Sequence, residues 1–432
     1  MTTVADHSRW SRKALVAISF ANGLEFFDFT IYSFFAPIIA KLYFPASDSM
    51  TSMLLAIGTF GVGFFMRPVG AVVMGAYADR YGRRAGMSLT MWLMMAGSAL
   101  IAFSPTHASI GVAAPLLIIA SRLVQGFALG GEIGASTAWL VEQGAPATRG
   151  YRGSWQFMSQ ALNTLVAAVV GVVLTTSLDS ASLASWGWRL PFVFGLAIGP
   201  LGIYLRRQLS EEWSSRDPSA MVFGRTLRRY GLVVVQGTVL MIGASAVTYI
   251  VLFYLSSYAE KYLHLPAGDA LWLSVAASAS AAVFSPIAGH LSDRLGRTYV
   301  IGVSRIVLVA AIYPSWVLMR AAAYLPLSLA IAAFLAMLVA FTTAPCIVLL
   351  AELFPVRIRA SGMSIVYCLA VSVFGGFAQF FALGLIRWTG SILAPAWYLV
   401  ACGLLSLLPL PFLDDPTGRP LVDDRVRSTP RS

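Results

Sequence analysis

Twelve apolar runs, each long enough to cross a lipid bilayer, divide this sequence of 432 residues. A helix that crosses a hydrocarbon core of about 30 Å needs about 20 predominantly apolar residues. Backbone polar groups in lipid must bond internally, and runs of this length do so as helices. The runs cover residues 15–40, 53–77, 87–104, 113–141, 154–176, 188–207, 231–257, 270–291, 299–319, 325–350, 362–386 and 394–413. The sequence therefore predicts an all-α polytopic membrane protein with twelve transmembrane helices.

Charged residues make up only 11% of the chain, and the basic ones lie mostly on one side of the predicted membrane. If residue 1 faces the cytoplasm, the cytoplasmic segments carry 22 of the 30 Lys and Arg residues, and the external segments carry five. This asymmetry follows the positive-inside rule. It predicts a multi-pass protein of the cell inner (plasma) membrane with both termini in the cytoplasm. The net charge of +11 is then a consequence of topology, so we expect the lipid bilayer, and no nucleic acid, as a partner.

A charged segment of ten residues occurs twice, as GAYADRYGRR at 75–84 and as GHLSDRLGRT at 289–298. The two copies are 214 positions apart, and each falls between the second and third run of its half. A second repeated pattern, a Glu and an Arg seven residues apart with a proline between them, follows the fourth and the tenth run. Two six-helix halves in parallel repeat are the arrangement of major facilitator transporters, which bind substrate near the midplane.

The repeats divide the chain into four parts. These are a six-helix half at 1–207, a cytoplasmic central loop at 208–230, a second six-helix half at 231–413 and a cytoplasmic tail at 414–432.

Several motifs resemble those of one transporter family. GAYADRYGRR resembles the loop 2–3 signature of the major facilitator superfamily. NGLEFFDF (22–29), RLVQGFALGGEIG (122–134) and SWGWRLPF (185–192) are similar to its metabolite:proton symporter family, and within it to citrate and tricarballylate carriers. Betaine/proline, α-ketoglutarate and shikimate carriers share these motifs. The resemblance covers nearly the whole chain and implies the major facilitator fold and proton-coupled transport of a small metabolite.

The repeated acids Asp79 and Asp293 are not needed to hold the topology. A carboxylate at the membrane edge can contact a helix N-terminus or a basic group of the opposite half. Such a contact exists in only one transport state, so we expect gates here. The resemblance likewise implies that this loop stabilises the outward-open state. A purely topological basic loop is the alternative. Because Thr298 replaces the last Arg of the first copy, we expect the Asp293 gate to be weaker.

The expected gating residues come from both repeated patterns. They are Asp79, Arg80, Arg83, Arg84, Glu142, Arg149, Asp293, Arg294, Arg297, Glu352 and Arg359.

Ionisable residues inside the apolar runs are costly and therefore candidates for function. Glu25 and Asp28 share one face of the first run, and Arg67 and Glu132 lie at about the depth of Glu25 if each residue rises by about 1.5 Å. The surplus of acid over base predicts that one carboxylate pairs with Arg67 while another takes up the proton. The proton-coupling candidates are Glu25, Asp28, Glu132 and Arg67, and Asp28 and Glu132 are equal alternatives for the carrier.

Arg122 lies further out in the fourth run, where no acid is expected at its depth. An unpaired buried guanidinium is a good anion ligand, and the resemblance links this Arg–Gln position to coupling. Polar residues at helical spacing on the first, fourth and fifth runs predict a lined cavity. Arg305 either snorkels to the cytoplasmic edge or contacts substrate. The substrate-binding candidates are Asn22, Tyr32, Arg122, Gln125, Gln156, Gln160 and Asn163.

The second half carries no acid within a run, so we expect it to supply substrate shape and gating. Its interior polar candidates are neutral, namely Tyr249, Tyr254, Ser278, Thr342, Cys346, Tyr367 and Gln379. The four histidines lie outside the runs or at their edges, and no metal cluster, phosphate loop or nucleophile–base pair is visible. We therefore expect no catalytic residue, no metal and no cofactor.

Together these features predict a symporter, driven by the proton gradient, that acts as a monomer and is not an enzyme. We expect it to import a small organic acid, a di- or tricarboxylate such as citrate or tricarballylate, because arginines lie inside the runs. A carrier of a zwitterionic osmolyte such as betaine or proline is an alternative, since aromatic residues, 12% of the chain, can hold a quaternary ammonium group. A membrane-embedded enzyme would need a nucleophile or metal constellation, and a sensor would need a soluble output domain.

Overall fold

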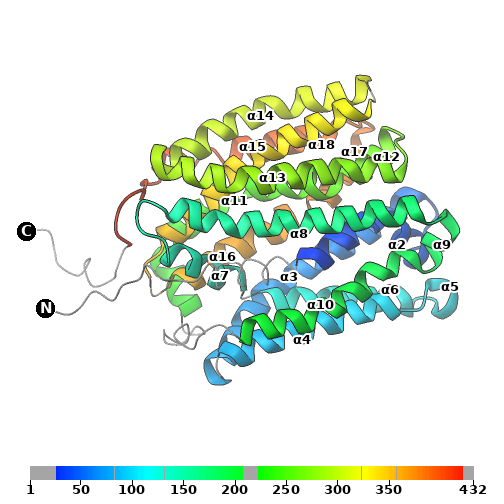
Figure 1. The fold of residues 1–432 in the computed structure, drawn as a ribbon, viewed down its shortest axis with the longest axis horizontal. Helices are drawn as coiled ribbons and strands as arrows, with labels where there is room; N and C mark the ends of the chain where they lie inside the picture. Colours follow the sequence, from blue (N-terminus) through cyan, green and yellow to red (C-terminus); the bar gives the residue numbers. More distant parts are fainter. Residues whose placement is uncertain are drawn as a thin grey trace, which may run out of the picture.

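The computed structural model describes residues 26–81, 83–130, 132–207, 222–322, 324–356 and 358–421, which form helices joined by short connections (Figure 1). The helices gather into two groups that follow the sequence. Those of the first half, blue to green, lie together, and those of the second half, green to red, lie beside them (Figure 1).

The N-terminal half supplies six membrane segments. The first is bent, because helix Phe26–Phe34 turns by 69° into α2 (Ala36–Tyr43). The others are α3 (Ser49–Tyr81), α4 (Arg83–Phe103), α6 (Ala113–Leu129) followed by α7 (Glu132–Glu142), α8 (Arg149–Ser177) and α10 (Leu190–Arg207). Short helices in the connections are α5 (His107–Ile110), α9 (Ser180–Ser185) and η2 (Gly187–Arg189).

The C-terminal half supplies six more. Two of them contain a π-helical segment: α11 (Val222–Thr248) continues through η4 (Tyr249–Tyr254) into α12 (Leu255–Tyr262), and α16 (Arg359–Ala370) continues through η5 (Val371–Gly375) to α17 (Ala378–Thr389). The others are α13 (Ala267–Leu295), α14 (Arg297–Ala322), α15 (Leu325–Leu353) and α18 (Ala394–Leu405), which is followed by η6 (Leu410–Phe412).

The prediction of twelve transmembrane helices is confirmed. Within the described ranges, eight helices are long and apolar enough to cross a membrane, and the bent pair Phe26–Phe34 and Ala36–Tyr43 makes a ninth. Ser88–Phe103 and Ala113–Leu129 are shorter apolar helices, and α10 completes the set. Some helices, such as α3 and α13, extend beyond the predicted runs, because they continue past the apolar core into the polar layer.

The second charged segment is not a loop, as the sequence suggested, but a helical hairpin. Asp293 lies in the last turn of α13, which ends at Leu295, and Arg297 is the first residue of α14. The single linking residue, Gly296, has φ of 99°, which favours glycine because it has no Cβ. The hairpin thereby holds the charges of both helix ends at one place.

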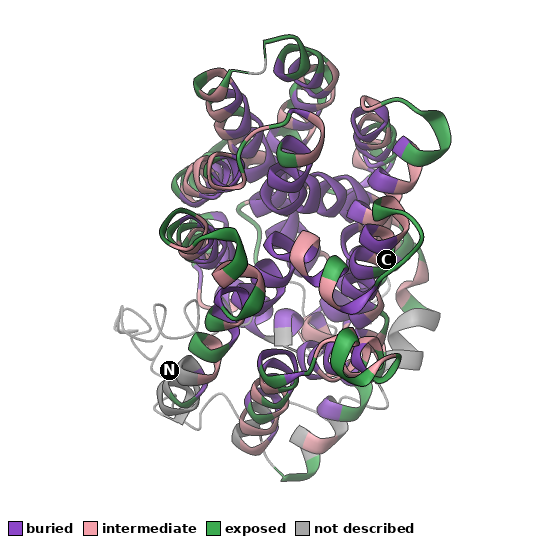
Figure 2. Ribbon diagram, turned by 90° about the vertical axis from the view of Figure 1, so that its right-hand side faces the viewer, coloured by how far each residue is buried: buried purple, intermediate pink, exposed green. Residues whose placement is uncertain are grey.

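Buried residues fill the centre of the helix assembly, and exposed residues lie on its periphery (Figure 2). The two halves meet where α8 packs along α13 and α15 and where α7 packs on α16. Large apolar side chains remain exposed on the outer helices, among them Phe65, Trp92, Val235 and Ile306. Such a surface suits lipid as its solvent.

Glycines bring α3 and α6 into direct backbone contact. A Cβ added to Gly126 would collide with the backbone oxygen of Gly63, and one added to Gly130 would collide with the backbone of Arg67. Small residues allow membrane helices to approach this closely. The contact holds Arg67 and Arg122 near each other in the first half.

Candidate functional site

Asp28 lies in a buried polar cluster built by three helices of the first half. Its carboxylate, on helix Phe26–Phe34, accepts hydrogen bonds from the hydroxyl of Ser98 on α4 and, at 3.5 Å, from Nε2 of Gln125 on α6. The Gln125 amide also donates to the Ser98 hydroxyl at 3.0 Å. Asp28 is 6% exposed, and its Oδ1 has no hydrogen-bond partner among the described residues. The structure thus brings together Asp28 and Gln125, and it adds Ser98, which the sequence reading missed.

Arg122 is fully buried beside this cluster. Its guanidinium carbon lies 4.0 Å from the ring centroid of Tyr32 and 5.3 Å from that of Phe29. None of its side-chain nitrogens has a hydrogen-bond partner in the described part of the chain, but it interacts electrostatically with Asp28. The expectation that no acid lies at the depth of Arg122 is therefore wrong. The depth of Arg122 was counted along one straight helix, whereas α6 ends at Leu129 and α7 begins at Glu132.

Arg67, on α3, is also buried, and its guanidinium carbon lies 4.0 Å from the ring centroid of Phe64 and 5.3 Å from that of Phe29. Among the described residues no carboxylate contacts it. It interacts electrostatically with Tyr249 and Tyr367 of the second half. The predicted pairing of Arg67 with Glu25 or Glu132 stays a prediction, because both of those side chains lie outside the description.

A small cavity lies between the halves. Its walls come from the first helix and α8 on one side and from α11, η4, α15 and α16 on the other. Its polar lining residues are Gln160, Thr164, Ser245, Thr248, Tyr249, Thr343 and Tyr367, and its aromatic residues include Phe26, Phe157 and Phe253. The volume of about 20 Å³ has room for about one water molecule. The structure therefore holds the halves closed on each other.

Some of the predicted lining residues lie at the cavity, and others do not. Gln160 and the second-half candidates Tyr249 and Tyr367 line the cavity. Gln156 is fully buried without a hydrogen-bond partner among the described residues, and Asn163 donates to the backbone oxygen of Ser159 at 3.0 Å. Neither Gln156 nor Asn163 lines the cavity.

Other predicted residues have structural contacts or lie outside the description. Tyr32 donates its hydroxyl to the backbone oxygen of Ala56 at 3.0 Å and so ties the first helix to α3. Asn22 and Glu25 precede the described residues, and nothing is described of the side chains of Glu132, Asp79, Arg83 and Arg84.

Arg305 neither snorkels nor lines the cavity, which corrects both alternatives. It is 1% exposed and donates from Nη1 to the backbone oxygens of Leu240, at 2.9 Å, and Ser406, at 3.4 Å. These carbonyls belong to α11 and to the end of α18. Arg305 therefore joins three helices of the second half.

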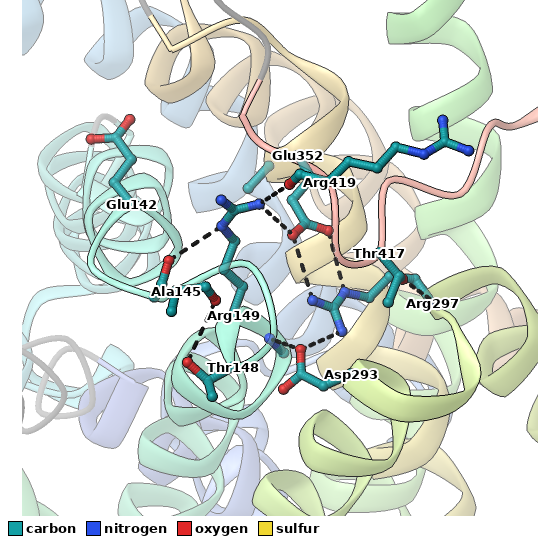
Figure 3. A network of polar contacts seen from close by, with 12 residues as sticks. Glu142, Ala145, Thr148, Arg149, Asp293, Arg297, Glu352, Thr417 and Arg419 are labelled. Atoms are coloured by element: carbon teal, nitrogen blue, oxygen red, sulfur yellow. Dashed lines mark hydrogen bonds and ion pairs between the residues drawn. The ribbon is translucent and has the colours of Figure 1, made fainter.

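Six of the predicted gating residues meet at the end of the molecule that the basic residues assign to the cytoplasm (Figure 3). Asp293 accepts hydrogen bonds from the backbone N–H groups of Gly150, at 2.8 Å, and Tyr151, at 2.9 Å, in the first turn of α8. It also pairs with Arg297 at 2.8 Å. A carboxylate at a helix N-terminus is stabilised by the helix dipole and by the free N–H groups. Asp293 thus joins the second half to the first, as predicted for this acid.

Glu352 extends this network. It pairs with Arg297 at 3.2 Å and with Arg149 of the first half at 3.7 Å (Figure 3). Nearby, Arg359 of the second half pairs with Glu142 of the first at 2.9 Å. We call Glu142, Arg149, Asp293, Arg297, Glu352 and Arg359 the inner gate. Arg80 and Arg294, also expected there, are exposed and take no part in these contacts.

The opposite end carries a smaller set of contacts, the outer gate, formed by Asp48, Thr51 and Arg387 with Ser33 and Gln379. Arg387 donates to the Thr51 hydroxyl at 2.8 Å and lies 3.9 Å from Asp48, with both charged side chains about half exposed. Hydrogen bonds from Thr51 hold the pKa of Asp48 below its usual value. Deeper in, Gln379 donates to the Ser33 hydroxyl at 2.8 Å. Both ends of the interface are therefore closed.

Comparisons with known proteins agree with this architecture. The sequence profile of sugar and other transporters matches residues 14–213, and that of the Major Facilitator Superfamily matches residues 237–430. A citrate-proton symporter of Klebsiella pneumoniae is 35% identical, over 91% of this chain and 90% of that protein. A glycine betaine/proline/ectoine/pipecolic acid transporter, OusA of Dickeya dadantii, is 30% identical, over 97% and 86%. The structure of a proton:xylose symporter, XylE, superposes with a TM-score of 0.77 at 15% identity, over 95% of this chain and 97% of that one.

Proposed function

This chain belongs to the major facilitator superfamily, and from that premise we propose that it imports a small organic acid together with protons by alternating access. The substrate we propose is a di- or tricarboxylate such as citrate or tricarballylate. The carrier would act as a monomer in the inner membrane, driven by the proton gradient alone.

One observation carries the proposal: in a buried site the acid Asp28 interacts electrostatically with Arg122, whose guanidinium has no hydrogen-bond partner among the described residues. Ionised Asp28 offsets the charge of Arg122. Protonated Asp28 leaves that charge uncompensated, and a buried guanidinium then attracts a carboxylate. Proton binding and anion binding therefore favour each other, and such coupling is reciprocal. This is the property that a proton symporter of an organic acid requires.

The gates supply the other half of the mechanism. In this structure both are closed and the central cavity is too small for a carboxylic acid. Opening one gate at a time would expose the cavity to one side, as alternating access requires. Asp293 and Glu352 would release Gly150 and Arg149 only when the inner side opens.

Transport of a zwitterionic osmolyte is the second candidate. The aromatic residues of the cavity, among them Phe26, Phe157 and Tyr249, could surround a quaternary ammonium group. The similarity to OusA supports the same candidate.

Uptake into proteoliposomes under an imposed pH gradient separates the two candidates. Citrate, tricarballylate, α-ketoglutarate, shikimate and betaine are compared, and a protonophore is the control. We expect gradient-driven uptake of a di- or tricarboxylate that the protonophore abolishes. Uptake of betaine alone would favour the osmolyte carrier, and uptake insensitive to the protonophore would refute proton coupling.

A further inference from the structure

Arg67 has no part in the mechanism above, yet its guanidinium is buried where the two halves meet. The residue is 1% exposed, and none of its three side-chain nitrogens has a hydrogen-bond partner in the described ranges. A guanidinium presents five N–H donors in one plane, and burying them without acceptors costs free energy. The arrangement is therefore suited to an anion.

The surroundings of Arg67 indicate where that anion would lie. Tyr249 and Tyr367 both line the central cavity, and both interact electrostatically with Arg67. The arginine comes from the first half and the two phenols from the second. A carboxylate at this point would accept hydrogen bonds from both halves at once.

The position of Phe29 sets the distance between the two arginines. The guanidinium carbons of Arg67 and Arg122 each lie 5.3 Å from the centroid of its ring. They are thus separated by no more than twice that distance. A short dicarboxylate can bridge such a gap when a charge-assisted hydrogen bond of about 2.8 Å is added at each end.

We propose that Arg67, Tyr249 and Tyr367 form a second carboxylate subsite, so that the substrate is a polycarboxylate bound between Arg67 and Arg122. This inference rests on the proposed function. The competing explanation is structural, because the rings of Phe64 and Phe29 already stabilise the Arg67 cation in part.

The test compares inhibition of transport by tricarballylate, glutarate and butyrate, which carry three, two and one carboxylates. The variants are Arg67→Gln and the double variant Tyr249→Phe/Tyr367→Phe. The matched control is Tyr398→Phe, which removes a buried phenol hydroxyl on α18, outside the cavity. We expect wild-type protein to prefer glutarate over butyrate by about tenfold or more, as a charged hydrogen bond would give. The variants should lower that ratio to below about threefold, and the control should keep it.

An unchanged ratio in the Tyr double variant would overturn the subsite, even if Arg67→Gln does not fold. Loss of folded protein from Arg67→Gln with that unchanged ratio would establish the structural role. The proposed function fails separately, if wild-type protein transports no carboxylate with protons.

A different observation carries a second inference, which concerns residues 414–421, here called the strap. Asp415 accepts hydrogen bonds from the backbone N–H of Thr298, at 3.0 Å, and from its hydroxyl, at 2.7 Å. The backbone N–H of Arg297 donates to the Thr417 hydroxyl at 3.1 Å. The strap therefore caps the free N–H groups at the start of α14. In most helices the residues just before the helix make this cap.

The strap then crosses to the first half. Nη1 of Arg149 donates to the backbone oxygen of Arg419 at 2.8 Å, in direct contact with the inner gate (Figure 3). Leu421 packs against a buried apolar cluster of Val141 from α7 and Val348 and Ala351 from α15. The same short segment thus contacts both halves at the end where they would separate.

We infer that the strap stabilises the state in which the inner gate is closed and must detach when that gate opens. Its contacts with α14 of the second half and with Arg149 of the first half cannot both persist if the halves separate there. The strap thereby sets how often the carrier opens inward, independently of substrate.

Hydrogen exchange of the full-length protein tests this inference. The variants are Asp415→Asn and Leu421→Asp, and the control is Asp414→Asn, because Asp414 is the exposed neighbour. We expect each variant, but not the control, to raise exchange about tenfold both at residues 297–300 and at residues 149–153, where the strap makes no backbone cap. Faster exchange confined to residues 297–300 and the strap would show a local cap and overturn the inference.

Discussion

The backbone N–H of Gly150 donates a hydrogen bond of 2.8 Å to Asp293, a residue 143 positions away in the other half of the molecule. The same carboxylate binds Tyr151 N–H and the Arg297 side chain. One carboxylate therefore caps a helix N-terminus of the first half and pairs with an arginine of the second half. The two halves could not separate at this end without breaking the hydrogen bonds from Gly150 and Tyr151 to Asp293.

The first prediction concerns this acid. Asp293→Asn removes the charge that faces the first turn of α8 and Arg297, and hydrogen bonds of a charged group are worth about 1.5–3 kcal/mol. We expect hydrogen exchange at residues 149–153 to rise about tenfold or more and transport to slow, with normal expression. Asp269→Asn, at the other end of α13, is the control. Unchanged exchange would leave the hairpin with a topological role only.

The second prediction concerns proton coupling. Asp28→Asn keeps the shape and the hydrogen bonds to Ser98 and Gln125 but removes the titrating group. We expect the variant to exchange substrate in counterflow at near the wild-type rate and to lose accumulation under a pH gradient. Asp179→Asn is the control, since Asp179 caps α9 and asparagine is an equally good cap. If Asp28→Asn accumulates substrate with normal pH dependence, the proton is carried elsewhere, and Glu132→Gln becomes the next variant.

The third prediction concerns Arg122. Arg122→Lys keeps the charge but loses the planar fork, so substrate binding should weaken about tenfold, and Arg122→Ala should weaken it further. Equilibrium binding at fixed pH is the measurement. Arg305→Lys serves as a buried control, because Arg305 donates to backbone oxygens away from the cavity. Wild-type affinity in both Arg122 variants would remove this residue from the substrate site.

The fourth prediction concerns the packing of α3 on α6. Gly126→Ala would push a methyl group into the backbone oxygen of Gly63, and overpacking costs about 1–3 kcal/mol or more. We expect a lower melting temperature and less monodisperse protein. Gly384→Ala is the matched control, because no atom lies within 4 Å of the added Cβ in α17 and alanine favours a helix. Equal melting temperatures for the two variants would contradict the close contact.

The fifth prediction concerns pH at the strap. Burial disfavours the charged form of Asp415, but hydrogen bonds from Thr417 and Thr298 outweigh this effect and hold its pKa below the usual value of 3.8. A lowered pKa in the folded protein stabilises the strap above pH 3.8, and the stabilisation is lost only as pH falls further. Protection of residues 297–300, corrected for intrinsic exchange, should therefore be constant from about pH 8 to pH 5. A loss within that range would mean that another group titrates.

The sequence was sufficient for the fold because the fold is locally encoded. Each apolar run forms its own helix or consecutive helices, and the two repeated patterns identify the two halves and all six charged residues of the inner gate. The same patterns also predicted Arg80 and Arg294 as gating residues, but both are exposed and take no part in the inner gate. Helix ends show which charges are available, whereas their partners depend on how the helices pack.

The site was harder to predict because its residues give weak local signals. Thr164, Ser245 and Thr248 each bond a backbone oxygen of their own helix, at 2.7–2.9 Å, so in sequence they resemble ordinary helix residues. They line the cavity only because both halves place them there, together with Thr343. The contacts of Arg305 could not be predicted for a related reason. Its acceptors are backbone oxygens, which every residue has, so the sequence gives no signal for them.

The two gates differ in a way that bears on direction. At the inner gate Arg297 and Glu352 are at most 1% exposed and Glu142, which pairs with Arg359, is 28% exposed, whereas at the outer gate Arg387 and Asp48 are 50% and 46% exposed. Salt and water weaken exposed pairs far more than buried ones. An empty molecule built in this way would open to the exterior more readily than to the cell interior. On the proposed function, such a bias would favour binding of substrate from outside over its release back from the inside.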